Sequence, residues 1–309
     1  MKQGLLFPGQ GSQHVGMGRE LAKRFPAARE TFEEADDALG MALSDVAWEG
    51  PPEVLTATEN AQPALYVHSL AAYRVVRERL GPVAAAAGHS LGELSAHGAA
   101  GTWSFADGLR AVRLRGELMA RAGDSAPGTM AAVLGLDLSA IAELCDSAAS
   151  AGMTVVPANL NAPGQVVVSG DLRAIEWISS EARRVGAKRV VPLAVSAAFH
   201  SPLMGPAAEV FRDALECTTF HRPAFPVVSN VTAEPAEEPG RIRELLVRQL
   251  TAPVRWIECV GRMRVLGVER FAELGPGRVL AGLNRRNAKG VATVSLGTPE
   301  SIDQMESAE

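Results

Sequence analysis

The chain has 309 residues, of which 47% are hydrophobic and 21% are charged, and its formal net charge at pH 7 is −5. This length and balance are typical of a globular protein that buries a substantial core without disulfides or bound metals. The acidic net charge argues against a general nucleic-acid binder, because such proteins usually carry a basic surplus.

Cysteine usage and hydropathy indicate the compartment. Cys145, Cys217 and Cys259 form no CxxC or Cys/His metal pattern, so we predict buried free thiols, a reducing compartment and no metal site. The first apolar run stops at Pro8, too soon for the core of a signal peptide. No run of about 18 uncharged apolar residues suggests a membrane span. We therefore expect a soluble, cytoplasmic protein.

The first part of the chain alternates apolar runs with glycine-rich segments. The run Gly4–Phe7 predicts a buried strand that enters the loop PGQGSQ at residues 8–13. The elements predicted next are helices at Arg19–Phe25, Thr31–Leu39 and Gln62–Leu80, a strand at Val83–Ala87, and helices at Glu93–Ala100 and Phe105–Ala122.

The middle of the chain, residues 128–196, changes character. The strands predicted there are Met130–Leu134, Val155–Asn161, Gln165–Ser169 and Val190–Ala194, and the helices are Leu138–Ser150 and a helix capped by Asp171 that runs to Val185. The order β-α-β-β-α-β is that of a ferredoxin-like subdomain. Because it interrupts a larger α/β pattern, we predict a small subdomain at 128–196 inserted into a domain formed by 1–127 and 197–309.

The last part of the chain returns to the α/β pattern. The elements predicted there are helices at Pro206–Leu215, Arg241–Leu250, Glu258–Leu266 and Arg278–Arg286, and strands at Val227–Asn230 and Val268–Leu274. The tail Thr298–Glu309 is polar, so we expect it to be frayed.

The strongest local signal is the segment GHSLG at residues 88–92, between a predicted strand and a predicted helix. This order is typical of a nucleophile elbow, a sharp turn that exposes the serine hydroxyl. The glycines are needed because side chains would clash across the turn, and the helix N-terminus favours developing negative charge. The pattern predicts Ser90 as a nucleophile, and the alternative is a glycine-rich turn with a structural serine.

A nucleophilic serine needs a base, and His200 is the best placed of six histidines. It follows a predicted strand and a stretch of small residues, although a lone histidine also fits a structural role. Serine before histidine is the chain order of α/β-hydrolases, so we predict an α/β-hydrolase-like large domain. No acid between them is obvious. Asp171 is better explained as a helix cap, and a backbone carbonyl can orient the histidine instead.

Six segments together resemble one known family. They are FPGQGSQ at 7–13, GHSLGE at 88–93, NLNAPGQ at 159–165, FHS at 199–201, QLTAPV at 249–254 and ELGPG at 273–277. In this order they are similar to the malonyl-CoA:acyl carrier protein transacylases, which include stand-alone enzymes of fatty-acid synthesis and acyltransferases of polyketide synthases. The resemblance runs from the first strand to Arg286. Leu94 and Ala197-Ala198 depart from the residues that are common in the family.

The resemblance implies a role for each site residue. It implies that Ser90 carries the acyl group and that His200 is the general base. It places the oxyanion hole at the backbone N–H groups of Gln10 and Leu91, and it gives the Gln249 backbone carbonyl the task of orienting the histidine.

Two further residues concern acyl selection. The resemblance implies that Arg115 binds the free carboxylate of malonate, since a planar guanidinium grips a carboxylate through two parallel hydrogen bonds. Without the resemblance, Arg115 fits an ordinary solvated helix arginine. Phe199 is similar to the malonyl-preferring members, because its ring narrows the space for an α-methyl branch.

The implied reaction moves malonyl from malonyl-CoA to the phosphopantetheine thiol of an acyl carrier protein, by a monomer without a metal or redox cofactor. Carrier proteins are acidic, so a basic docking patch is expected. Its candidates are Lys188, Arg189, Arg278, Arg285 and Arg286. The alternatives are a thioester hydrolase and a non-catalytic carrier-binding module. The sequence leaves open the fatty-acid or polyketide pathway and an unusual dicarboxylic acyl unit.

Overall fold

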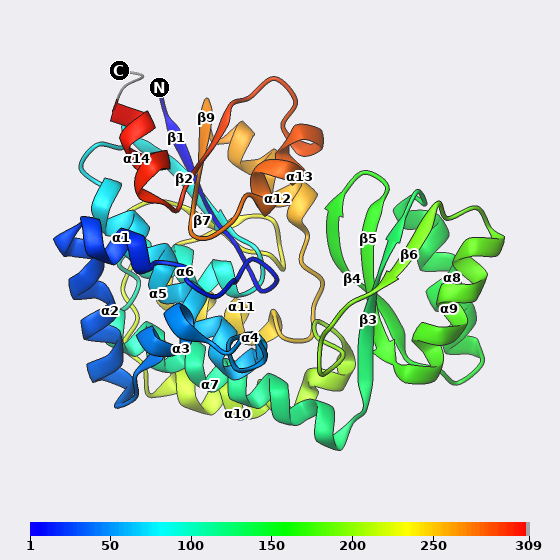
Figure 1. Cartoon of the computed structure of the whole chain (residues 1–309). Helices are drawn as coiled ribbons and strands as arrows, with labels where there is room; N and C mark the ends of the chain where they lie inside the picture. Colours follow the sequence, from blue (N-terminus) through cyan, green and yellow to red (C-terminus); the bar gives the residue numbers. More distant parts are fainter. Residues whose placement is uncertain (307–309) are drawn as a thin grey trace.

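The computed structural model describes residues 1–306 and has a mixed α/β fold with two separate sheets (Figure 1). The larger sheet has the strand order β10-β9-β1-β2-β7-β8, and its neighbours are parallel except for β7 and β8. Its strands are β1 (Gln3–Phe7), β2 (Val83–Gly88), β7 (Val227–Val228), β8 (Pro235–Ala236), β9 (Arg270–Leu274) and β10 (Thr293–Leu296). We call this sheet and its helices the six-stranded unit.

Strand β1 lies at the centre of the six-stranded unit and is buried along its whole length. Its side chains alternate between the faces of the sheet, as the strand period of two requires. Leu5 and Phe7 join the larger core, whereas Leu6 joins a second core together with Ala85 and Ala87 of β2. Helices therefore cover both faces, as is usual for parallel sheets.

The helices divide between these two cores. Helices α12 (Trp256–Val265) and α13 (Val279–Asn287) pack on the second core. The helices that pack on the larger core are α1 (Arg19–Arg24), α2 (Pro26–Leu39), α3 (Leu43–Glu49), α4 (Pro52–Thr56), α5 (Thr58–Val76), α6 (Leu91–Ala99), α7 (Phe105–Ser125), the 3-10 helix η1 (Pro202–Met204), α10 (Gly205–Glu216), α11 (Pro239–Arg248) and α14 (Pro299–Glu306).

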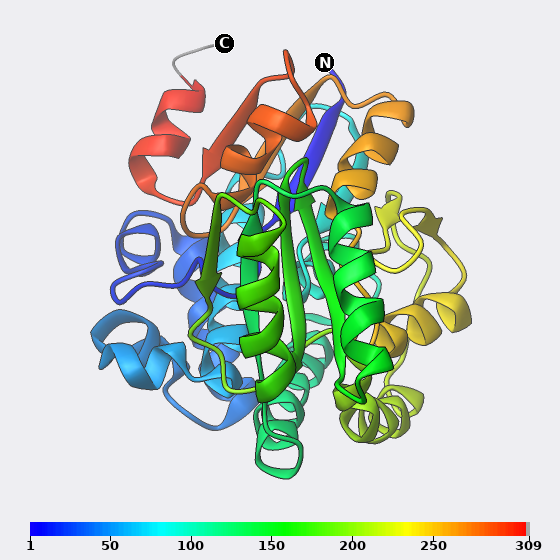
Figure 2. The same ribbon diagram turned by 90° about the vertical axis from the view of Figure 1, so that its right-hand side faces the viewer.

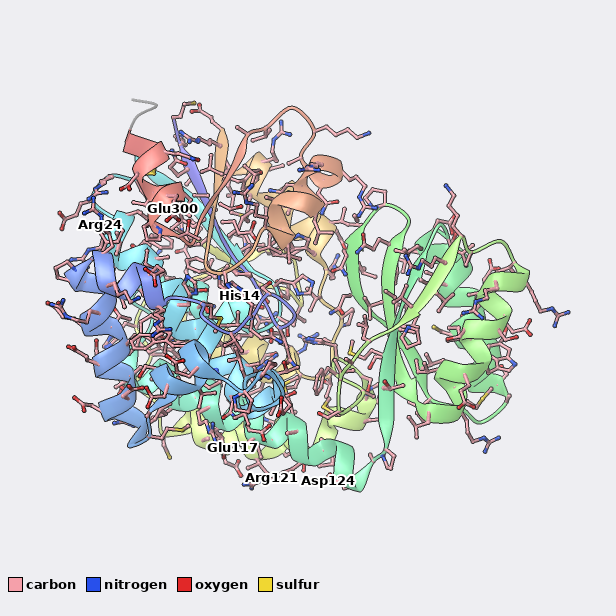
Figure 3. All side chains as sticks on the ribbon, viewed as in Figure 1. His14, Arg24, Glu117, Arg121, Asp124 and Glu300 are labelled. Carbon is pink, nitrogen blue, oxygen red and sulfur yellow. The ribbon has the colours of Figure 1, made fainter. Side chains whose placement is uncertain are left out.

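The second sheet lies beside the first, and all its neighbouring strands are antiparallel, in the order β4-β5-β3-β6. Its elements are β3 (Gly128–Leu134), α8 (Leu138–Ser150), β4 (Val155–Ala162), β5 (Gln165–Asp171), α9 (Leu172–Arg184) and β6 (Arg189–Pro192). Both helices cover the outer face of the sheet, which faces the viewer in Figure 2. We call these elements the four-stranded unit. The end of α7, where Arg121 and Asp124 lie, leads into it (Figure 3).

Every predicted helix and strand has a counterpart in the structure, with ends that differ by a few residues. The tail is the main correction. The prediction of a frayed segment from Thr298 onward is wrong for α14, because Ile302 is fully buried and joins the larger core. Residues 307–309 lie outside the described part of the chain. No element was predicted at the positions of α3, α4, η1, β8 or β10. Within residues 1–306, no helix is both long enough and apolar enough to cross a membrane.

Candidate active site

The GHSLG segment forms a sharp turn between β2 and α6. Ser90 has φ 52° and ψ −111°, a backbone conformation that side-chain-bearing residues rarely adopt. A Cβ on Gly88 would lie 1.8 Å from the Gly92 carbonyl carbon, and one on Gly92 would lie 2.0 Å from the Phe7 carbonyl oxygen. Both glycines are therefore required by close backbone contacts, and the turn presents Ser90 to a cavity.

His200 meets Ser90 from the chain that follows the four-stranded unit. Its Nε2 lies 2.7 Å from Ser90 Oγ, and its Nδ1 lies 2.7 Å from the backbone oxygen of Gln249. Because a carbonyl oxygen only accepts, Nδ1 carries the proton and Nε2 accepts from the serine hydroxyl. Burial, followed by the nearby Arg115 charge, lowers the pKa of His200 to about 3, so His200 is a neutral base near neutral pH.

Arg115 extends from α7 to the same serine and is fully buried. Its Nη2 donates to Ser90 Oγ at 3.2 Å and to Gln249 Oε1 at 2.8 Å, and its Nη1 donates to Gln62 Oε1 at 2.7 Å. Burial lowers the pKa of Arg115 to about 10, which leaves it charged near neutral pH. Its Nε is buried and, within residues 1–306, has no hydrogen-bond partner. The guanidinium therefore keeps a donor for an incoming acceptor.

Gln10 and Leu91 border the same cavity. Gln10 lies in the loop after β1, which Figure 3 shows near the centre of the molecule, where His14 is labelled. Leu91 is the first residue of α6. In the described part of the chain, neither backbone N–H donates a hydrogen bond. Two unused donors from two segments therefore border the cavity, as an oxyanion hole requires.

The cavity has a volume of about 320 Å³ and lies between the two units. Ser90, His200 and Arg115 form its polar side. Its apolar lining comes from both units and includes Met119, Met130, Leu193, Val195 and Phe199. Phe199 is almost fully buried, so its ring limits the space beside the serine.

Two buried residues of the site, Glu93 and Asn230, were not predicted from the sequence. Glu93 lies within the GHSLGE segment, but no role was assigned to it. Its Oε2 accepts from Gln249 Nε2 at 2.6 Å and from the Asn230 N–H at 3.0 Å. Asn230 in turn bonds the Ser90 N–H. Burial raises the pKa of Glu93 to about 7. No local pattern signals this network, because it joins segments about 140 residues apart.

Other candidate residues lie elsewhere. Asp171 accepts from the N–H groups of Thr154 and Ala174 at 2.7 and 2.8 Å, so the helix-cap interpretation is confirmed. Cys145 and Cys259 are buried as predicted, but the prediction is wrong for Cys217, which is exposed. Over residues 1–306, no group of three or more His, Cys, Asp or Glu side chains is arranged to hold a metal ion.

The basic candidates for a docking patch do not line the catalytic cavity. Arg278 and Arg285 line a different cavity, of about 930 Å³, between α13, β10 and α14. Arg286 donates to Gln165 Oε1 and thereby connects the six-stranded unit to the four-stranded unit.

Comparisons with known proteins agree with this geometry. Residues 5–298 match the family described as the acyl transferase domain. The malonyl CoA-acyl carrier protein transacylase of Bacillus subtilis is 44% identical over 302 residues, which cover 98% of this chain and 95% of that protein. The crystal structure of an acyl carrier protein S-malonyltransferase from Vibrio cholerae has a TM-score of 0.95 and 42% identity, and the match covers 98% and 99% of the two chains.

A third relative is a malonyl-transacylase in complex with its type II polyketide synthase acyl-carrier protein. It is 41% identical to this chain with a TM-score of 0.95, and the match covers 100% of each chain. Since these matches span almost every residue at over 40% identity, the chain belongs to the malonyl-CoA:acyl carrier protein transacylase family of acyltransferases.

Proposed function

We propose that this chain transfers a malonyl group from malonyl-CoA to the phosphopantetheine thiol of an acyl carrier protein, through an ester with Ser90. The observation that carries the proposal is the set of contacts at Ser90 Oγ, which lies 2.7 Å from His200 Nε2 and 3.2 Å from Arg115 Nη2. A nucleophile, its base and a cation for a carboxylate meet at one atom. The reactions named for the relatives support the same acyl unit and acceptor.

In the first half-reaction, Ser90 Oγ bonds to the thioester carbonyl carbon while His200 Nε2 accepts the hydroxyl proton. The carbonyl oxygen becomes an oxyanion, which the N–H groups of Gln10 and Leu91 stabilise. The C–S bond then breaks, and the coenzyme A sulfur takes the proton from His200. The Gln249 carbonyl keeps the imidazole ring oriented throughout, through its contact with Nδ1.

The second half-reaction reverses these steps with a different thiol. The phosphopantetheine thiol of the carrier protein gives its proton to His200, and its sulfur attacks the ester carbonyl carbon. The same two N–H groups stabilise the second oxyanion. When the C–O bond breaks, Ser90 takes the proton back from His200, so the enzyme returns to its starting state without a metal or redox cofactor.

Arg115 selects the acyl group. The malonyl carboxylate accepts from the guanidinium, whose buried Nε has a free donor. An acyl group without a second carboxylate leaves this buried cation poorly paired, which is costly. The same argument disfavours a hydrolase that accepts simple acyl groups. Phe199 narrows the cavity beside the serine and thereby favours malonyl over methylmalonyl.

Substrate binding also changes the strength of the base. Burial and then the Arg115 charge lower the pKa of His200. A malonyl carboxylate on Arg115 offsets that charge, so the pKa of His200 rises once the correct substrate is bound. The cation that selects the substrate therefore also couples its arrival to general-base catalysis.

We extend the proposal to the architecture and setting of the site. Residues 1–127 and 197–309 form an α/β-hydrolase-like catalytic domain, which the parallel sheet and the elbow support. Residues 128–196 form a ferredoxin-like subdomain, supported by the strand order β4-β5-β3-β6. The protein acts as a cytoplasmic monomer, and Lys188, Arg189, Arg278, Arg285 and Arg286 receive the acidic carrier protein of fatty-acid or polyketide synthesis.

Intact-mass analysis tests the proposal. The protein is incubated separately with malonyl-CoA, methylmalonyl-CoA and acetyl-CoA, and Ser90→Ala is the matched control. We expect a malonyl-sized gain in mass that disappears in Ser90→Ala, little gain with the other two donors, and loss of the label on addition of holo-carrier protein. No gain from malonyl-CoA, or a preference for acetyl-CoA, contradicts the malonyl assignment and favours the hydrolase.

A further inference from the structure

The Asn230 side chain provides hydrogen-bond partners for main-chain groups of the elbow that have no neighbouring strand. The parallel pairing of β2 with β7 ends at Ala87 and Val228, because β2 enters the elbow and β7 turns toward β8. Beyond that point, Asn230 Oδ1 accepts from the Ser90 N–H at 2.8 Å, and its Nδ2 donates to the Gly88 carbonyl at 2.8 Å. One carboxamide therefore continues the hydrogen bonding of the sheet around the turn.

A second carboxamide holds the other end of Ser90. Gln249 Nε2 donates to the Ser90 carbonyl oxygen at 3.0 Å. That oxygen belongs to the same planar peptide unit as the Leu91 N–H, so fixing the oxygen also fixes the direction of the N–H. The two carboxamides thus hold both polar groups of a serine whose φ is 52°. The strained conformation persists because the surroundings determine it from both sides.

Glu93 anchors both carboxamide residues. Its Oε2 accepts from Gln249 Nε2 and from the Asn230 N–H, and all three residues have no exposed surface. Gln249 also bonds Arg115 through Oε1. None of the three anchoring residues lines the catalytic cavity, so they act on the reaction through the groups that they hold.

We infer that Asn230 and Glu93 are positioning residues that keep the Leu91 N–H directed at the reacting carbonyl oxygen. Asn230 acts through its own bonds to the elbow backbone, and Glu93 acts through Gln249. The inference rests on the proposed acyl transfer. It requires that loss of either residue slows formation of the acyl-enzyme while the affinity for malonyl-CoA changes little. It also requires a weaker hydrogen bond to the ester carbonyl of the acyl-enzyme.

The test compares Asn230→Ala with Asn284→Ala. Asn284 is a matched control, because it is 2% exposed and donates through Nδ2 to Thr293 at a place away from Ser90. Acyl-enzyme formation is followed by rapid quench and intact mass. The ester carbonyl band is recorded by infrared spectroscopy, with malonyl-CoA carrying carbon-13 at the thioester carbonyl.

For Asn230→Ala we expect the acylation rate to fall by about 10- to 100-fold, which is less than the loss typical for removal of an oxyanion-hole donor. The KM for malonyl-CoA should change by less than about threefold, since a misdirected oxyanion donor acts in the transition state. The carbonyl band should shift to higher frequency. Asn284→Ala should lose stability without a shift of the band.

A second pair of variants covers the case in which Asn230→Ala fails to fold. Glu93→Gln keeps an oxygen that accepts from both partners, whereas Glu93→Ala removes the acceptor. We expect the band and the rate of Glu93→Gln to stay near those of the wild type, and those of Glu93→Ala to follow Asn230→Ala.

Three results overturn the inference: an unshifted band in the Asn230→Ala and Glu93→Ala enzymes, an equal shift in Asn284→Ala, or Glu93→Gln behaving like Glu93→Ala. A wild-type protein that forms no malonyl ester contradicts the proposed function itself, and this outcome is distinct because no band is then seen at all.

Discussion

The two units differ in what they bury. The four-stranded unit packs two helices on one face of its sheet through apolar side chains, and aspartates cap both helices. The six-stranded unit buries an apolar core as well, but also Glu93, Arg115 and His200. Buried charges are costly unless they are paired and hydrogen-bonded. The strained backbone and the buried titratable groups therefore belong to the six-stranded unit, while the four-stranded unit adds apolar side chains to the cavity.

The largest predicted effect comes from placing a methyl group in the elbow of the six-stranded unit. In Gly92→Ala the new Cβ would lie 2.0 Å from the Phe7 carbonyl oxygen in β1, which is a backbone atom and cannot rotate away as a side chain could. We expect a destabilisation of about 3 kcal/mol or more, together with loss of acyl transfer. Urea unfolding and intact-mass acylation measure both effects.

Gly261→Ala is the control for that substitution. Gly261 lies inside α12, and a Cβ there would meet no atom within 4 Å. Replacing a helical glycine by alanine should stabilise the protein by about 0.5–1 kcal/mol. A stable, active Gly92→Ala protein would show that the elbow tolerates a shift of β1, and the claim of a rigid site would be wrong.

The second challenge concerns the buried cation. Arg115→Ala should lower kcat/KM for malonyl-CoA by about 10²- to 10⁴-fold, because two charged hydrogen bonds of about 1.5–3 kcal/mol each are lost. Turnover with acetyl-CoA should fall far less. Arg113→Ala is the control, since Arg113 lies on the same helix but bonds Glu117 and Asn60 outside the cavity. If kcat/KM fell equally with malonyl-CoA and acetyl-CoA, Arg115 would not be the residue that selects the acyl group.

Features that depend on local patterns could be predicted from the sequence in both units. GHSLG identified the elbow because its glycines answer a local steric demand. The four-stranded unit followed from its element order, because each of its elements is short and regular. Asp171 was correctly interpreted as a cap, since capping is a local pattern.

Features that depend on contacts between distant segments of the chain could not be predicted from the sequence. Arg115 on α7 is buried against Gln62 of α5 and Gln249, which follows α11, so its role needed the family resemblance. Glu93 and Asn230 form their network across 137 residues of chain. Strand β7 is shorter than predicted because Asn230 continues the hydrogen bonding with its side chain instead of its backbone. Helix α14 was not predicted because its composition is polar, although its Ile302 side chain is fully buried.

The third prediction uses pH, because the pKa shifts of the buried histidines and of Glu93 have opposite effects on stability below neutral pH. Burial lowers the pKa of His68 to about 4 and of His97 and His200 to about 3, so below pH 6.5 the unfolded chain binds protons that the folded chain does not. Stability therefore falls as the pH falls. The pKa of Glu93 is raised to about 7, so between pH 4.5 and 7 this group has the opposite effect.

These three histidines against Glu93 give a net difference of about two protons, and hence a loss of about 2–3 kcal/mol per pH unit between about pH 6 and 5. Burial also lowers the pKa of His89 and raises that of Glu273, and these two shifts oppose each other. Urea unfolding at each pH measures the slope. Glu93→Gln removes the opposing group, so its slope should be steeper than that of the wild type. An unchanged or flatter slope in Glu93→Gln would mean that Glu93 is ionised in the folded protein at pH 5.

The smallest predicted effect is in the four-stranded unit. Asp171→Ala removes the acceptor for the N–H groups of Thr154 and Ala174, and we expect a loss of about 1–2 kcal/mol, as for other helix caps. Asp171→Asn keeps an accepting oxygen and should lose less. The acylation rate should stay within about twofold of the wild type in both variants, because Gln249 and not an acid orients His200. A stable Asp171→Ala protein with slow acylation would mean that Asp171 acts with Ser90 and His200 in catalysis. The four-stranded unit would then contribute to the reaction as well.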